Sequence, residues 1–149
     1  MTLFLQTTLI AHILLGLIGI ALTVATWVGL IQIDPKINVV KRRSFGSFVS
    51  FILSWILGGY YYVVYYGSVV KPIIKGGQYP WVHAVIMEAK EHIFLFLPFL
   101  SLVLFLSLVF LPNLENLKYK KALINLAAIL SILGVVVALM GSGISGAVR

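Results

Sequence analysis

Four long apolar stretches decide what this chain can fold into. They cover roughly residues 7–32, 45–70, 81–111 and 122–148. A bilayer core about 30 Å thick is crossed by about 20 apolar residues in a helix, so each stretch is long enough to span it. Short loops join neighbouring helices in antiparallel order. The sequence therefore predicts one all-α domain, an integral membrane antiparallel four-helix bundle that crosses the cell membrane as a multi-pass protein.

The composition excludes most soluble functions. Only 10% of the 149 residues are charged, whereas about a quarter are charged in a soluble domain. The four stretches occupy most of the chain and leave no room for a soluble catalytic module. The chain has no cysteine, which excludes disulfides, thiol nucleophiles and cysteine metal sites. No phosphate-binding loop and no nucleophile–base–orienter triad is visible, so no catalytic residue is assigned.

The first apolar stretch is expected to remain in the protein as a span. A cleaved signal peptide has a basic beginning and an apolar core of about 7–15 residues. Residues 1–8, MTLFLQTT, contain no lysine or arginine, and the apolar run after them is longer than such a core. We therefore count this stretch as the first of the four helices.

The basic residues predict the orientation of the bundle. The first loop has four of them and the third has three, whereas the second has two. Basic loops stay on the cytoplasmic side, so loops one and three are expected inside, and both termini and loop two outside. The net charge of +7 then marks orientation and attraction to anionic lipid, and it requires no nucleic acid partner. These residues are Lys36, Lys41, Arg42, Arg43, Lys71, Lys75, Lys118, Lys120 and Lys121.

Ten residues at the start of the third stretch, His83 to His92, are unusually rich in ionisable side chains. They contain two of the chain's three histidines, two of its four acids and a lysine. In an α-helix Glu88 and His92 share a face, and His83 and Lys90 lie roughly opposite. We interpret His83 and Lys90 as part of a solvated turn at the outer interface. Glu88 and His92 are expected to turn inward, because ionisable residues in a span usually face the bundle interior.

The third histidine, His12, is predicted to face His92 across the bundle. Nineteen residues separate His12 from the inner end of its helix at Ile31, and nineteen separate His92 from the inner end of its own at Leu111. The two imidazoles are therefore expected at the same depth, near the outer boundary of the hydrocarbon. Gly16, one turn from His12 on the same face, is expected to clear space beside the ring. The same count reaches the tyrosines of residues 60–66 and the glycines Gly141, Gly143 and Gly146.

The second stretch ends in five tyrosines within residues 60–66. The interpretation we favour is an aromatic belt at the membrane interface, and the alternative is that some of the hydroxyl groups line a site. The residues that follow are expected to interrupt the helix because they include two prolines and two glycines. These residues are Pro72, Gly76, Gly77 and Pro80.

A haem site is the first function that this pattern favours. Two histidines on facing helices bind one haem iron from both sides, and bundle cores commonly hold cofactors. In its four spans and its inter-helix pair of His12 and His92, with Gly16 beside the first, the chain resembles the small four-helix membrane cytochromes of the b type. The resemblance implies one haem b near the outer face, between helices one and three. It also implies electron exchange with a quinone in the membrane or with an external redox protein.

Two other functions stay open. His12, Glu88, Glu91 and His92 form a mixed nitrogen and oxygen ligand set that suits a divalent metal such as zinc or iron. A buried histidine–glutamate pair without a cofactor instead relays protons or conducts an ion, in a conducting subunit or an assembly factor. In all three cases the lipid bilayer is the first partner, and a homo-oligomer or a larger membrane complex is the second.

Overall fold

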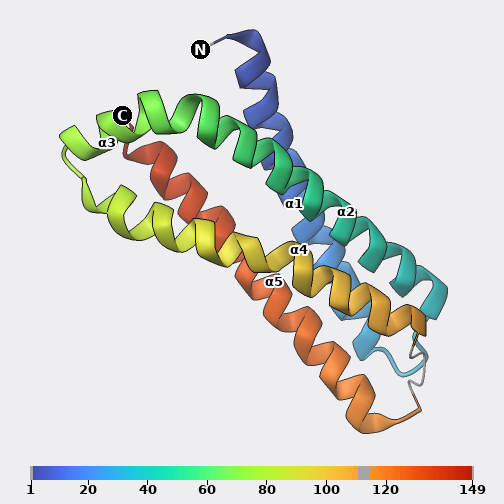
Figure 1. The fold of residues 1–149 in the computed structure, drawn as a ribbon. Coiled ribbons are helices and arrows are strands. Elements are labelled where there is room, and N and C mark those ends of the chain that lie inside the picture. Colours follow the sequence, from blue (N-terminus) through green and yellow to red (C-terminus); the bar gives the residue numbers. More distant parts are fainter. Residues whose placement is uncertain (1, 111–114, 149) are drawn as a thin grey trace.

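The structure is a computed structural model that describes residues 2–110 and 115–148. Its elements are α1 (Leu3–Ile31), α2 (Ile37–Tyr61), η1 (Tyr62–Val70), α3 (Lys71–Gly76), η2 (Val82–Met87), α4 (Glu88–Phe110) and α5 (Leu117–Gly146). The elements η1 and η2 are π-helices, in which backbone hydrogen bonds join residues five apart. The described residues contain no strand. The prediction of an all-α membrane bundle of four helices is confirmed (Figure 1).

The spans begin and end at different residues from those predicted. Four helical stretches are long and apolar enough to cross a membrane: Leu3–Ile31, Ile37–Gly76, Val82–Phe110 and Leu117–Gly146. The second combines α2, η1 and α3 over 40 residues, so the helix is not interrupted at Pro72. Pro72 lies in the first turn of α3, where a missing N–H is tolerated. The chain turns instead at residues 77–80, and Leu111, the predicted end of the third span, lies outside the described residues.

Each long helix packs against two neighbours. α1 lies along α2 and α5, and α4 also packs against α2 and α5, so α1 and α4 stand across the bundle from each other. Figure 1 shows both ends of the chain on the side of α3, and the α1–α2 loop on the opposite side. We call the end that holds η1, α3 and η2 the π end, and the end that holds residues 32–36 the basic end. Which end faces the cytoplasm stays a prediction from the loop charges.

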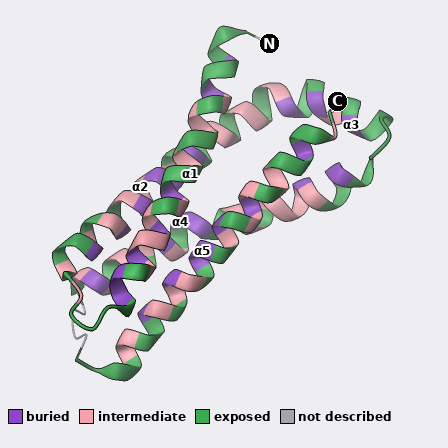
Figure 2. Ribbon diagram, turned by 180° about the vertical axis from the view of Figure 1, so that it is seen from behind, coloured by how far each residue is buried: buried purple, intermediate pink, exposed green. Residues whose placement is uncertain are grey.

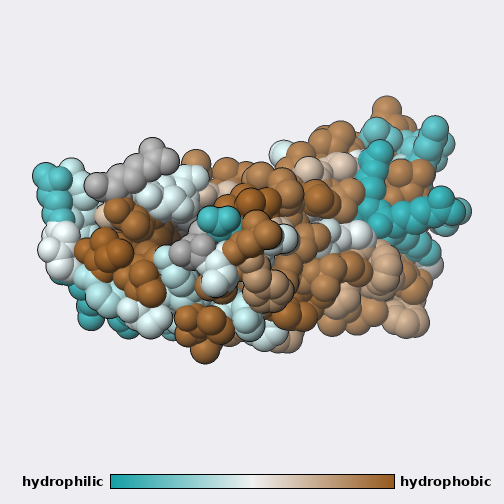
Figure 3. Space-filling view, turned by 90° about the horizontal axis from the view of Figure 1, so that it is seen from above, coloured by the Kyte–Doolittle hydropathy of each residue, from teal (hydrophilic) through white to brown (hydrophobic). Residues whose placement is uncertain are grey.

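The bundle has apolar side chains both inside and outside. Three buried clusters follow one another along its length, and Figure 2 shows the buried residues on the inner faces of the helices. Large hydrophobic side chains also cover the outside, among them Phe110, Leu139 and Ile132, which are 73%, 67% and 63% exposed. In Figure 3 hydrophilic residues gather at the two ends and hydrophobic residues cover most of the surface between them. A surface of this kind fits a lipid bilayer, so the protein is a multi-pass membrane protein.

Small residues hold α1 and α2 together. A side-chain carbon added at Gly19 would lie 2.8 Å from the Phe51 ring, so only glycine allows this close approach. The Thr23 and Ser47 hydroxyl oxygens are 2.5 Å apart, and both hydroxyls reach the main-chain oxygen of Gly19 at 2.8 and 3.1 Å. Small residues and hydroxyl groups commonly stabilise helix contacts in membranes. We call this contact, from Thr23 and Ser47 up to His12 and Gly58, the α1–α2 seam.

Candidate functional site

The two π-helices come together at the π end of the bundle. Buried side chains from η1, α3, η2 and α5 form one cluster there: Tyr66, Val70, Ile74, Val82, Met87 and Ile144. π-Helical segments are rare, are usually a single turn long and often occur at functional sites. Here they extend over nine residues in η1 and six in η2. The two π-helices therefore mark the π end as the candidate functional site.

His83 lies at the centre of the polar contacts at this end. The residue is only 2% exposed. Its Nδ1 is 3.0 Å from the hydroxyl oxygen of Tyr66, and the two rings are 5.9 Å apart between centroids. Its Nε2 is 3.7 Å from Oε1 of Glu88, whose side chain is half-exposed. Each ring nitrogen of one buried imidazole thus faces a different titratable group.

The π-helical backbone explains why the sequence pattern missed this arrangement. In an α-helix, residues five apart point about 140° away from each other, and this placed His83 on the opposite face from Glu88. In a π-helix the hydrogen bonds join residues five apart, and η2 carries His83 onto the side of Glu88. The interpretation of His83 as part of a solvated turn is wrong, because the side chain is buried.

Some tyrosines of residues 60–66 line a site, and another has the exposure expected of an aromatic belt. Tyr66 is 3% exposed and bonds to His83. Tyr62 stacks on Tyr66 with ring centroids 5.1 Å apart and the planes at 18°, and its hydroxyl group bonds to the Glu91 carboxyl group. Tyr60 is 44% exposed and meets only the edge of Phe4 in ring contact. Tyr62 and Tyr66 therefore line a site, whereas Tyr60 has the exposure of a belt residue.

Glu91 and Lys90 extend the polar contacts into the bundle. Oε1 of Glu91 is buried and has no hydrogen-bond partner within the described residues. Lys90 is half-buried, and its Cε and Nζ lie 3.7 Å from the position that a side-chain carbon at Gly141 would take. The glycine in α5 thus provides the room that the lysine side chain occupies. Three elements, η1, η2 and α4, thus supply the side chains that take part in these contacts.

His12 is bound by α2 and does not lie free in the bundle. Its Nδ1 donates to the main-chain oxygen of Ser54 at 2.8 Å, and the Ser54 hydroxyl donates to the main-chain oxygen of His12, also at 2.8 Å. The ring lies directly on Gly58, where a side-chain carbon would be 2.6 Å from it. The edge of the Phe94 ring covers it with centroids 5.8 Å apart. The glycine that makes room for this imidazole is therefore Gly58, and Gly16, predicted for this role, faces the Ser54 hydroxyl instead.

His92 is exposed, and its Nδ1 donates to the main-chain oxygen of Glu88 at 2.6 Å. Phe94, two residues further along α4, points toward His12, and residues two apart in an α-helix point in nearly opposite directions. The two histidines predicted to face each other thus lie on different sides of α4. As placed, they do not fit as the two axial ligands of one haem.

The four side chains predicted to bind a divalent metal do not come together either. No three His, Asp or Glu side chains in residues 2–110 and 115–148 lie close enough to hold a metal ion. His12 faces Ser54, His92 is exposed, Glu88 approaches His83, and Glu91 bonds to Tyr62. The set of His12, Glu88, Glu91 and His92 is therefore divided among different partners.

Comparison with protein-family models, with curated proteins and with solved structures finds no match to this chain. The function must therefore be inferred from the side chains and their arrangement. The arrangement that offers most chemistry is the set of Tyr66, His83 and Glu88, and we call it the relay cluster.

Proposed function

We propose that this protein relays protons at its π end and acts as a cofactor-free subunit that moves protons between the membrane surface and a partner within the membrane. The observation that supports the proposal is the burial of His83 between the hydroxyl group of Tyr66 and the carboxyl group of Glu88. The termini and the π end are then expected on the outer face, in the cell membrane, because basic loops stay in the cytoplasm.

The imidazole of His83 is suited to this task because it has two nitrogens that exchange roles. One nitrogen accepts a proton while the other releases one. The Glu88 carboxylate takes a proton from the membrane surface and passes it to Nε2, while the proton on Nδ1 leaves to the oxygen of Tyr66, whose own hydroxyl proton passes to the partner within the membrane. Glu88 is then a carboxylate again, so the net charge of the three groups is the same before and after the step, and the imidazole has changed from one neutral tautomer to the other.

The exposure of the three groups gives the relay a direction. Glu88 is half-exposed at the surface of the protein, whereas His83 and Tyr66 are 2% and 3% exposed. Lys71 and Lys75 of α3, together with Glu91 of α4, lie close enough to act on the charge of His83. Two cations and two carboxylates thus act on the charge of the imidazole.

The test is nuclear magnetic resonance of the full chain in lipid nanodiscs with ¹⁵N-labelled histidine rings. The three histidines give three pairs of ring signals. We expect Tyr66→Phe to shift the Nδ1 signal of His83 and Glu88→Gln to shift its Nε2 signal, because each removes the group that faces that nitrogen. The signals of His12 provide the internal control, since its ring bonds to α2.

Two outcomes would contradict the relay. If neither variant changes the His83 signals, the imidazole does not exchange protons with these groups. If His83 stays in a single protonation state and tautomer over the whole pH range in which the chain is folded, it cannot relay. Haem binding and electron transfer with a quinone or redox protein stay predictions from the sequence, and an absorption spectrum of the same preparation tests them.

A further inference from the structure

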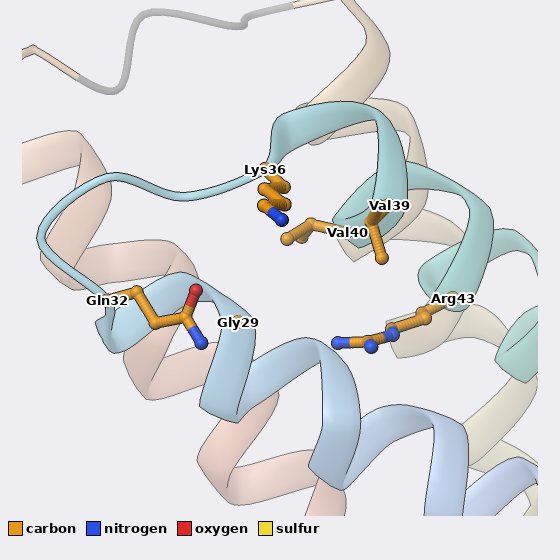
Figure 4. A pocket seen from close by; sticks show the side chains of 6 residues that line it. All are labelled: Gly29, Gln32, Lys36, Val39, Val40 and Arg43. Atoms are coloured by element: carbon orange, nitrogen blue, oxygen red, sulfur yellow. The ribbon is translucent and has the colours of Figure 1, made fainter.

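The start of α2 and the end of α1 enclose a small cavity at the basic end, far from the relay cluster. It has a volume of about 230 Å³ and is lined by Gly29, Gln32, Lys36, Val39, Val40 and Arg43. Figure 4 shows the Arg43 guanidinium, the Lys36 ammonium and the Gln32 amide group pointing toward the same space between the two helices. We propose that this cavity binds the phosphate group of an anionic phospholipid.

Arg43 is held in position for this role. Its Nη1 donates to the main-chain oxygen of Ala25 in α1 at 3.1 Å, so the side chain crosses from α2 to α1 and is half-buried. A guanidinium group has five N–H donors in a rigid plane, and it binds phosphate through two parallel hydrogen bonds. One contact to α1 fixes the group and leaves the other donors for a ligand.

No ion pair among the described residues balances the positive charge of the cavity. Within the described residues, no carboxylate lies within 4 Å of Lys36 or Arg43, although four acids occur in the chain. Lys120 of α5 adds a further cation beside the cavity, where its Nζ donates to the main-chain oxygen of Gln32 at 2.9 Å. Three basic side chains from two segments thus meet at the end of α1, and an anion is the ligand that they suit.

The size and the surroundings of the cavity favour a lipid headgroup over a free metabolite. Sites for whole small molecules measure about 300–1,000 Å³, and this cavity is smaller, so it suits a single phosphate group. Val39 of the lining is 38% exposed, and Val28 and Ile31, which precede the lining residues Gly29 and Gln32 in the chain, are 45% and 53% exposed. A phospholipid bound here lays its acyl chains along these apolar side chains while the phosphate lies between Lys36 and Arg43.

The experiment compares wild type with variants that remove one positive charge each. The full chain is reconstituted in vesicles of phosphatidylcholine and phosphatidylglycerol in equal parts, and native mass spectrometry counts the phosphatidylglycerol that stays bound. We expect Arg43→Gln and Lys36→Gln each to lower this binding by about tenfold or more, the size expected when a hydrogen bond to a charged group is lost. Arg42→Gln and Lys41→Gln are the matched controls, because both remove one charge from the same segment and neither residue lines the cavity.

Three outcomes would overturn the proposal. An equal loss in all four variants means that diffuse surface charge attracts the lipid. A wild-type protein without preference for phosphatidylglycerol has no such site. If inorganic phosphate displaces no lipid but binds to the protein in pure phosphatidylcholine vesicles, and only Arg43→Gln prevents this, the cavity holds free phosphate instead.

A second measurement distinguishes failed folding from lost binding. Phosphatidylglycerol that binds only the folded protein raises its melting temperature. We expect this rise for wild type and Arg42→Gln and its absence for Arg43→Gln. The melting temperatures in pure phosphatidylcholine show whether Arg43→Gln is folded at all, and an Arg43→Gln protein that is folded and still gains stability from phosphatidylglycerol contradicts the site.

Discussion

The α1–α2 seam and the π end both place polar side chains inside the bundle, but in different ways. In the seam, the Ser54 hydroxyl donates to the main-chain oxygen of His12, and one hydroxyl of the Thr23–Ser47 pair donates to the main-chain oxygen of Gly19 while the other donates within the pair. At the π end, two tyrosines bond to titratable side chains: Tyr66 to His83, and Tyr62 to Glu91. Main-chain oxygens cannot exchange protons with their partners under ordinary conditions, whereas phenol, imidazole and carboxyl groups can. The polar groups of the seam therefore join α1 to α2, whereas those of the π end include groups that can exchange protons.

The largest effect is expected where the seam is tightest. Gly58→Ala adds a carbon that would lie 2.6 Å from the His12 ring, and overpacking of this kind destabilises a protein by about 1–3 kcal/mol. Unfolding of the purified protein in mixed detergent measures the change. Gly59→Ala is the matched control, since nothing lies within 4 Å of its added carbon. Equal stability of the two variants would show that the seam is not closely packed.

A smaller loss of stability is expected when the relay cluster loses a hydroxyl group. Tyr66→Phe removes the 3.0 Å contact with Nδ1 of His83, and a hydrogen bond of this kind contributes about 1 kcal/mol. The same unfolding experiment measures it. Tyr60→Phe serves as control because Tyr60 is 44% exposed. A Tyr66→Phe protein as stable as the Tyr60→Phe protein would mean that the contact with His83 adds no stability.

The hydroxyl pair in the seam is expected to contribute less than the relay cluster does. Thr23 and Ser47 are 2.5 Å apart, and hydrogen bonds between membrane helices average about 0.6 kcal/mol. A double-mutant cycle with Thr23→Val and Ser47→Ala isolates that coupling energy. A coupling energy larger than the stability lost in Tyr66→Phe would mean that the seam's hydroxyl pair contributes more to stability than the relay cluster's hydrogen bond does.

The smallest effect is expected from His92→Gln. The ring is exposed and bonds only to its own helix, and surface substitutions change stability by less than about 0.5 kcal/mol. The variant should also leave the ring signals of His83 unchanged. Loss of a bound haem from the His92→Gln protein would instead restore the first hypothesis made from the sequence.

The sequence was sufficient for the fold class and for the number of spans. Hydrophobic length alone predicts four helices, and the structure contains four apolar helices of that kind. The exact ends of the second span were not predictable from the sequence. Proline commonly ends a helix, but Pro72 lies in the first turn of α3, directly after the π-helix η1.

The candidate site was only partly predictable. The ionisable stretch at the start of the third span does contain the site, and Glu88 belongs to it. The partner of Glu88 is His83 instead of His12 or His92, since the helical period changes from α to π between residues 82 and 88. The partner of His12 depends on which helices are neighbours in the bundle. The hydrophobic pattern of the sequence does not show that α1 packs against α2 and α5.

The length of the helices has a consequence for the membranes in which this protein works. α1 has 29 residues and is about 44 Å long at 1.5 Å per residue, well above the hydrocarbon thickness of about 30 Å. The stretch from Ile37 to Gly76 is longer still, with 40 residues, and the relay cluster lies at its far end. Such hydrophobic mismatch is relieved by tilting or by a thicker bilayer. Bilayer thickness therefore sets how deeply the half-exposed Glu88 carboxyl group lies, and a thin membrane leaves it in water while a thick one covers it.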